Sequence, residues 1–259
     1  MTSIRASADW LSFLEDSINE LNSMLERLAV EPPPVPEQHP RALWAFSLFY
    51  GSLTVDIAQS ALLLLRAGHQ RTPLMLLRSL FEYHVRLRYY GVNEQAATDT
   101  LHRVEARMFQ AKKEAVGSPY LDTLDEDYRN VMEKMIADPR MLAETKFGHM
   151  LNSTIPGISS AGPKSTLVTN YKQPSWFVHG DEITMEDVVA DPEGDRPIWK
   201  GVASHIVDGN WTSQHIIYQL IDVMNVAEWT LTQNNLATLK RNADLQELSD
   251  RYGMRDDVR

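Results

Sequence analysis

The apolar side chains of this sequence recur at three- and four-residue steps over long stretches, a period that is typical of helices. The first stretch, residues 8–29, places seven apolar residues on one helical face: Trp10, Leu11, Leu14, Ile18, Leu21, Leu25 and Leu28. The sequence shows no convincing two-residue alternation of the kind that marks strands, and no internal repeat. The chain is therefore predicted to be all-α.

The longest apolar run covers residues 42–68 and has the length of a membrane-spanning helix. Asp56 and Gln59 interrupt its middle, however, and a charged group at the centre of a bilayer costs about 2.5–3.5 kcal/mol. We therefore predict a central bundle helix over 41–67, and no membrane partner. Gly68 suits the cap that ends this helix, and the short turn after it predicts an antiparallel hairpin with the next helix.

Clusters of proline and glycine divide the rest of the chain into further helices. The proline-rich segment 30–40 predicts a rigid connector. Helices are predicted over 73–90, 94–116, 122–137, 140–150, 166–179 and 201–239. Together the elements predict a single-domain helical bundle with antiparallel long helices over residues 1–245, in which the N-terminal helix and the connector precede a bundle over 41–239. A charged tail, 246–259, follows it.

Composition narrows the functions open to such a bundle. The 259 residues include no cysteine, which excludes disulfides, cysteine-ligated zinc and thiol catalysis. A net charge of −10 argues against a broad nucleic-acid-binding surface, although it leaves room for a small local site for RNA. The N-terminal segment carries acidic residues where a signal peptide needs an apolar core, so a cytoplasmic protein is expected.

The sequence contains incomplete versions of two ligand-binding motifs, the phosphate-binding P-loop and the di-iron site. The loop "GISSAGPKST" resembles a phosphate-binding P-loop, but Pro163 separates Gly162 from Lys164 and removes a backbone donor. His102 and Glu105 reverse the Glu-x-x-His order of di-iron bundles, and the sequence has no second copy of the motif. We therefore predict no metal and no cofactor.

The segment "RTPLMLLRSLFEYHVRLRYYG", residues 71–91, carries charged residues within a strongly amphipathic helix. Arg78 and Glu82 are four residues apart, so both project from one face, close to the apolar stripe. A charge in such a position is costly unless it is paired. The pair is therefore either purely structural, or an arginine that a carboxylate holds in position to bind an anion.

A second polar face is predicted in "YKQPSWFVHG", residues 171–180. Tyr171, Ser175 and His179 recur at four-residue steps, so a continuous helix would align them. They would supply a general base or acid with hydrogen-bond donors, or else a polar seam buried between helices. Because a proline lies inside the stretch, a helix that begins near Gln173 would leave Tyr171 off this face.

The segment "LLLLRAGHQRTPLMLLRSLFEYHVRLRYY", followed downstream by "YKQPSWFVHG", resembles a group of uncharacterised bacterial helical proteins with the pattern R-S-[LF]-x-E … S-x-x-[VT]-H-G. The resemblance covers roughly residues 40–180. That group is distantly similar to the HEPN bundles, prokaryotic defence and toxin domains, many of them metal-independent RNases that act as dimers. Arg78 and His84 fit the HEPN motif R-x(4–6)-H in spacing. Six positions on a straight helix turn through about 600°, however, so these two side chains do not share a face.

The resemblance implies RNA cleavage in which a histidine deprotonates the ribose 2′-hydroxyl and an arginine stabilises the charge on the phosphate. The expected catalytic residues are Arg78, Glu82 and His179, and the expected substrate-binding residues are Tyr171, Ser175 and His84. The predicted function is a HEPN-like RNase or toxin-type effector in prokaryotic defence. The alternatives are a non-enzymatic helical module that binds a nucleotide, a small anion or a protein partner through the same pocket, and a bundle in which these residues only satisfy one another.

Two observations predict binding partners: the number of apolar residues on two helices, and the resemblance to HEPN-like proteins. Apolar residues exceed the needs of one core on helices 42–67 and 211–236, so a homodimer is predicted. RNA or a nucleotide, and an antitoxin or defence partner protein, are the other partners that the resemblance implies.

Overall fold

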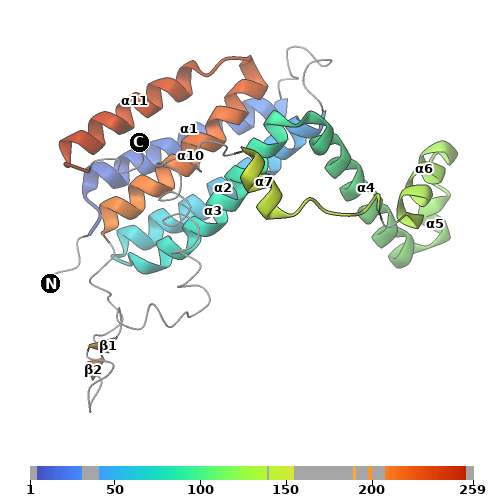
Figure 1. Ribbon diagram of the computed structural model, residues 1–259, viewed down its shortest axis with the longest axis horizontal. Coiled ribbons are helices and arrows are strands. Elements are labelled where there is room, and N and C mark those ends of the chain that lie inside the picture. Colours follow the sequence, from blue (N-terminus) through green and yellow to red (C-terminus); the bar gives the residue numbers. More distant parts are fainter. Residues whose placement is uncertain are drawn as a thin grey trace.

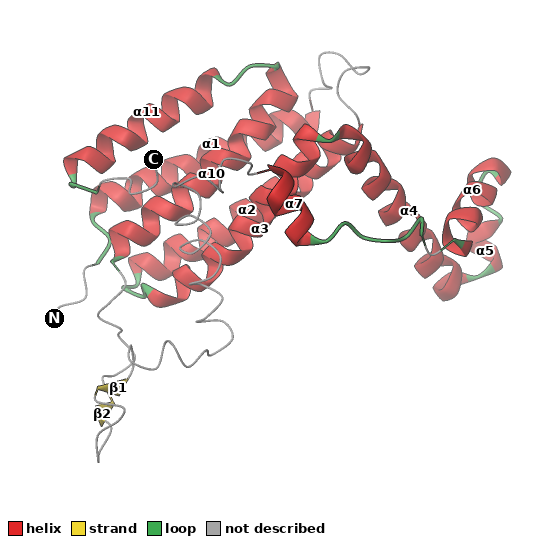
Figure 2. Ribbon diagram, in the orientation of Figure 1, coloured by secondary structure: helices red, strands yellow, loops and turns green. Residues whose placement is uncertain are grey.

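The computed structural model describes residues 5–30, 41–138, 140–154, 189–190, 198–199 and 208–254. Within them lie nine helices and two short strands (Figure 1). In chain order the elements are α1 (Ala8–Val30), α2 (Arg41–Arg66), α3 (Arg71–Val92), α4 (Glu94–Val116), α5 (Ser118–Leu121), α6 (Glu126–Ala137), α7 (Phe147–Thr154), β1 (Val189–Ala190), β2 (Ile198–Trp199), α10 (Gly209–Thr232) and α11 (Leu236–Arg251). Helix dominates the described chain (Figure 2), and the predicted all-α bundle is confirmed.

Helix α10 is the centre of the bundle. α1, α2, α3 and α11 all pack against it. Six consecutive residues, 212–217, are buried, so this part of the helix has no face open to water. Ile216, Ile217 and Leu220 are completely buried, and each such side chain contributes about 1.5–3 kcal/mol of transfer free energy. Because a helix that is buried on all sides must be surrounded by others, α10 determines how the other helices are arranged.

Helices α2 and α3 form the predicted antiparallel hairpin, and they lie side by side in Figure 1. Gly68 ends α2 with a positive φ of 84°, a conformation that costs glycine little because it has no Cβ. The Gly68 N–H donates to the Leu65 carbonyl at 3.0 Å, and the His69 N–H donates to the Leu64 carbonyl at 2.9 Å. This is the hydrogen-bond pattern of a Schellman cap, and it confirms the predicted role of Gly68.

Helix α4 leaves the bundle after α3 and carries α5 and α6 at its far end (Figure 1). These helices have a small hydrophobic cluster of their own, which comprises Ala106, Phe109, Met132 and Met135. The chain then returns to the bundle, where α7 packs against α3. The described chain therefore has a main core and a satellite core, with α4 joining them.

A buried carboxylate joins α10 to α11. Glu228, on α10, is 6% exposed. Its oxygens accept hydrogen bonds from the backbone N–H groups of Ala237 and Thr238, both at 2.8 Å, and from the Thr238 hydroxyl at 2.6 Å. The first N–H groups of a helix have no partner within that helix, so Glu228 caps α11 and its negative charge is stabilised by the helix dipole.

The C-terminal part of the chain differs from the prediction. The long helix expected over 201–239 is wrong: α10 begins at Gly209, where Asp208 caps it, and ends at Thr232. Gln233 has a positive φ of 57° and turns the chain into α11. α11 continues to Arg251, so the first residues of the expected tail 246–259 belong to a packed helix. Its buried Leu245 and Leu248 are the signal that the charged composition obscured.

Two further helices begin later in the chain than predicted. The helix expected over 122–137 is α6, which begins at Glu126 because the Asp125 side chain caps it there. The helix expected over 140–150 is α7, which begins only at Phe147. The helix expected over 166–179 lies outside the described residues, and so does the connector expected over 30–40, apart from Val30, which ends α1. The single-domain assignment of 1–245 stays a prediction.

Helix α2 is, within the described part of the chain, the one helix that has the length and composition to cross a membrane. It packs against α1, α3, α4 and α10. Leu43, Phe46 and Leu62 on α2 belong to the main core. The prediction that this segment is a bundle helix is therefore confirmed.

The Glu228 cap predicts a large effect on stability. In Glu228→Ala, two backbone N–H groups and a hydroxyl lose their acceptor, which should lower the free energy of unfolding by about 2–4 kcal/mol. Urea denaturation followed by circular dichroism measures this. The matched control is Glu247→Ala on α11: this side chain is 77% exposed, and its loss should cost less than about 0.5 kcal/mol. Equal costs in the two variants would contradict the role given to Glu228.

Candidate functional site

Three charged side chains form a row along α3. Arg78 Nε donates to Glu82 Oε1 at 3.2 Å, and Arg86 Nη2 lies 3.6 Å from Glu82 Oε2. The three side chains are 24%, 25% and 30% exposed, so they are neither dry nor fully solvated. Glu82 therefore holds one arginine a turn before it and another a turn after it. The predicted same-face position of Arg78 and Glu82 is observed, and Arg86 is an addition that its four-residue spacing from Glu82 indicates.

Helix α7 covers the end of this row. The Arg86 guanidinium carbon lies 5.5 Å from the centre of the Phe147 ring, which is within the range of a cation–π interaction. The row is thus fixed at one end by an aromatic side chain and a carboxylate together. Such an arrangement holds an arginine in a defined orientation, which is what binding of an anion requires.

His84 faces α10, on a different side of α3 from the Arg78–Glu82 pair. Its Nδ1 atom lies 2.9 Å from Gln219 Oε1 and 3.3 Å from Asp222 Oδ2, both on α10. An ionised Asp222 accepts hydrogen bonds and donates none, so in the neutral imidazole the proton is on Nδ1 and the lone pair is on Nε2. Arg78 and His84 therefore do not share a face, as the helical period predicts.

The second ring nitrogen of His84, Nε2, belongs to a side chain that lines a pocket. Nε2 has no hydrogen-bond partner within the described chain. The only fully buried side-chain nitrogen or oxygen atoms without a partner among the described residues are those of Trp10 and Thr54, so Nε2 retains contact with solvent. His84 lines a pocket of about 410 Å³ between α3 and α10. An imidazole with one nitrogen held between an amide oxygen and a carboxylate, and the other nitrogen without a partner, has the arrangement of a general base.

The other polar residues of this pocket suit a phosphate ester of a nucleoside. Arg88 lies one helical turn after His84, is exposed, and has no carboxylate within ion-pair distance among the described residues. Trp229 is 48% exposed and presents a flat aromatic surface beside the pocket. Asn225 and Asn235 line it as well, and amide groups both donate and accept hydrogen bonds. The volume falls within the roughly 300–1,000 Å³ of small-molecule sites.

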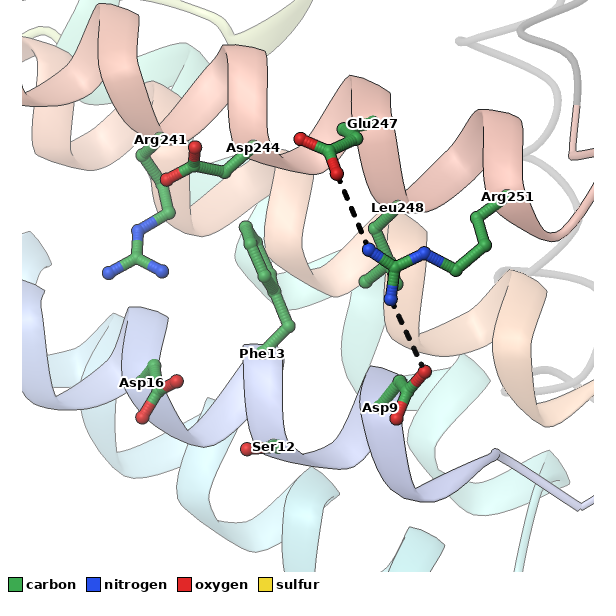
Figure 3. Close-up of a pocket in the computed structure, with 9 residues that line it drawn as sticks. All are labelled: Asp9, Ser12, Phe13, Asp16, Arg241, Asp244, Glu247, Leu248 and Arg251. Carbon is green, nitrogen blue, oxygen red and sulfur yellow. Dashed lines mark hydrogen bonds and ion pairs between the residues drawn. The ribbon is translucent and has the colours of Figure 1, made fainter.

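A pocket of similar volume, about 410 Å³, lies between α1 and α11 (Figure 3). Arg251 spans it, 3.6 Å from Asp9 and 3.4 Å from Glu247. Arg241 donates to Glu20 at 2.7 Å and lies 5.0 Å from the centre of the Phe13 ring. The ion pairs of these two arginines join α11 to α1. Because carboxylates outnumber arginines in the lining and both arginines are paired, this pocket is unsuited to an anion.

Three of the predicted site residues, Tyr171, Ser175 and His179, lie outside the described residues, as does the loop that contains Lys164. Their predicted roles stay predictions. In the part of the chain that the structure describes, histidines and carboxylates form no group of three or more placed to hold a metal ion.

The sequence analysis did not identify Arg88, Asp222 or Trp229 as site residues. The four-residue spacing of His84 and Arg88 was visible in the sequence and indicates a shared face. Asp222 and Trp229 gave no comparable signal, because they lie on α10 and meet α3 only in the folded chain.

No protein family, curated protein or solved structure matches this chain. The site is therefore interpreted from its own chemistry.

The hydrogen bonds of His84 predict its tautomer. At a pH near 8.5, where histidine side chains are largely neutral, long-range ¹H–¹⁵N correlation spectra should show His84 protonated at Nδ1. In Asp222→Asn the carboxylate is lost, and the Nε2-protonated form should become populated. An Nε2-protonated His84 in the unmodified protein would contradict the geometry that we describe. His102 on α4 serves as the reference, because an exposed imidazole should populate both neutral tautomers.

Proposed function

We propose that this protein is a HEPN-like, metal-independent RNase or toxin-type effector of prokaryotic defence, and that its chemistry takes place in the pocket between α3 and α10. The observation that carries the proposal is His84: its Nδ1 lies against Gln219 and Asp222, its Nε2 has no hydrogen-bond partner among the described residues, and its side chain lines the pocket. The resemblance of the α3 segment to HEPN-like proteins supports the same class of reaction.

In the proposed reaction, His84 Nε2 takes the proton from a ribose 2′-hydroxyl. The 2′-oxygen then attacks the adjacent phosphorus, the bond from phosphorus to the 5′-oxygen breaks, and the leaving 5′-oxygen takes a proton from solvent. The products are a 2′,3′-cyclic phosphate and a 5′-hydroxyl. Arg88 stabilises the negative charge that develops on the phosphate oxygens, and Trp229 stacks against a base. Asp222 is a positioning residue, because it acts through His84.

The sequence-based choice of catalytic residues, Arg78 and Glu82 with His179, is a second version of the same function. Glu82 holds Arg78 in a defined orientation, as an anion-binding arginine requires. Arg78 and His84 lie on different faces of α3, so the two versions use different surfaces and different histidines. Variants of His84 and His179 therefore distinguish them.

A non-enzymatic module that binds a nucleotide or a small anion is the second candidate function. The observation that favours it is charge: the chain carries −10 overall, and Asp222 lines the same pocket as Arg88. A negative surface repels a long polyanion more than it repels a single nucleotide. The pocket volume, about 410 Å³, is also of the size that one nucleotide requires.

RNA cleavage tests the proposal. Purified wild type should cleave an unstructured single-stranded RNA in the presence of EDTA and leave 2′,3′-cyclic phosphate ends. His84→Gln and Arg88→Gln should each lose about 100-fold or more in rate. His102→Gln, a change of an exposed histidine on α4, should keep full activity, and circular dichroism should show that every variant is folded. A 2′-deoxy residue at the cleaved position should block the reaction.

The same experiment separates the rival interpretations. Activity that survives His84→Gln but is lost in His179→Ala and Arg78→Gln would assign the chemistry to the sequence-based residues. Wild type without any cleavage would contradict the RNase proposal. Nucleotide binding that is then lost in Arg88→Gln would establish the non-enzymatic function.

The predicted homodimer is a separate proposal. Phe49 and Leu63 on α2, Trp229 on α10 and Leu236 at the start of α11 are large apolar side chains with 48–71% of their surface exposed. A second copy of the chain that packs on them would remove this apolar surface from water. We expect size-exclusion chromatography with light scattering to give twice the 29.5 kDa chain mass at micromolar concentration. Leu63→Glu should shift the protein toward monomer if α2 forms the interface, and a wild-type monomer would contradict the prediction.

A further inference from the structure

A smaller pocket lies where α4 leaves the bundle, on the side of α3 that carries Glu82 and Arg86. It has a volume of about 170 Å³. Residues of α2, α3, α4, α7 and the segment before α7 line it, and the charged ones are Arg86, Arg103, Arg107 and Glu144. Three arginines against one carboxylate is an unusual local balance in a chain whose net charge is −10. The lining therefore favours an anionic ligand.

Arg103 is the least compensated of the three arginines. Its Nη2 donates to the hydroxyl of Thr100, which in turn donates to the Ala96 carbonyl. Within the described chain no carboxylate lies within ion-pair distance of Arg103, although the side chain is partly buried. Arg103 and Arg107 are also one helical turn apart, and like charges at that spacing repel each other. A bound anion would remove both costs.

The other two arginines are held in position by neighbours. Arg86 is fixed by Glu82 and by the Phe147 ring. Arg107 donates to Glu144 at 2.5 Å and to the Leu142 carbonyl at 3.5 Å. Guanidinium groups that are held in this way lose little conformational entropy when they bind a ligand.

Two tyrosines complete the lining. Tyr90 is 3% exposed, and Tyr50 lies beside it. Burial raises the pKa of the Tyr50 hydroxyl above its ordinary value, and Tyr90 adds to this, while Arg86 opposes it. The Tyr50 hydroxyl therefore remains protonated at neutral pH and can donate a hydrogen bond.

We infer that this pocket binds a small phosphate dianion, either inorganic phosphate or the phosphate group of a small phosphomonoester. Planar guanidinium groups match the oxygens of a tetrahedral phosphate with two hydrogen bonds each. The volume is below the roughly 300–1,000 Å³ of sites for larger organic ligands, which excludes a whole nucleotide. The ligand would bridge α3 and α4, so it would also fix α4 against the bundle. This inference does not depend on the RNase proposal, because His84 lines a different pocket.

Calorimetry and thermal unfolding of the full chain test the inference. Sodium phosphate should raise the Tm by about 2–4 °C over sodium chloride of equal ionic strength, because it binds the folded state. Arg103→Gln should weaken phosphate binding about tenfold, which corresponds to one lost charged hydrogen bond. In Glu144→Gln the amide oxygen can still accept the hydrogen bond that holds Arg107, while the opposing negative charge is lost, so this variant should bind phosphate more tightly. Glycerol 3-phosphate, run in parallel, shows whether the site prefers a phosphomonoester to free phosphate.

The matched control is Arg140→Gln, which changes an arginine that is 90% exposed and that, among the described residues, pairs with Asp138 alone. It should bind phosphate as the wild type does, and so should His84→Gln. Phosphate and chloride with the same effect on Tm would overturn the inference, as would unchanged affinity in folded Arg103→Gln. If Arg103→Gln does not fold, the Glu144→Gln result decides: tighter binding supports the site, and weaker or unchanged binding refutes it.

Discussion

Everything else in this bundle depends on the burial of α10. Because residues 212–217 leave this part of the helix no face open to water, its buried polar groups need partners within the protein. Three side chains of α10 have such partners through hydrogen bonds: Gln214 reaches Ser249 on α11, Gln219 reaches His84 on α3, and Glu228 caps α11. The partners of α10 are thus selected by hydrogen bonding as well as by apolar packing.

The need of α10 for polar partners explains how His84 can have a structural role and a functional role together. Gln219 needs a partner, and the histidine supplies it through Nδ1. Asp222 beside the same nitrogen sets the tautomer, and His84 lines the pocket that Arg88 also lines. A histidine with a purely structural role does not require the solvent contact that Nε2 retains. A general base requires a neighbour that orients its ring, and Asp222 is placed to do this.

The arm formed by α4, α5 and α6 needs contacts that fix it to the main bundle. Its own core is small, and α4 must be held where it leaves the bundle. The contacts available there are polar: Arg86 with Glu82 and Phe147, and Arg107 with Glu144. Ion pairs between exposed groups contribute little, so a ligand that joins Arg86 and Arg103 would add more to this junction than either pair does.

The sequence alone determined the all-α class, most helix boundaries from α1 to α4, the hairpin at Gly68, and the pairing of Arg78 with Glu82, because all of these follow from interactions between residues close in the chain. It failed at α11, where the charged composition concealed the buried Leu245 and Leu248. Only the tertiary structure decided that Asp222 orients His84 and that Glu228 caps α11. The helical period shows which face of a helix a side chain occupies, but the partner on that face depends on which helix packs against it.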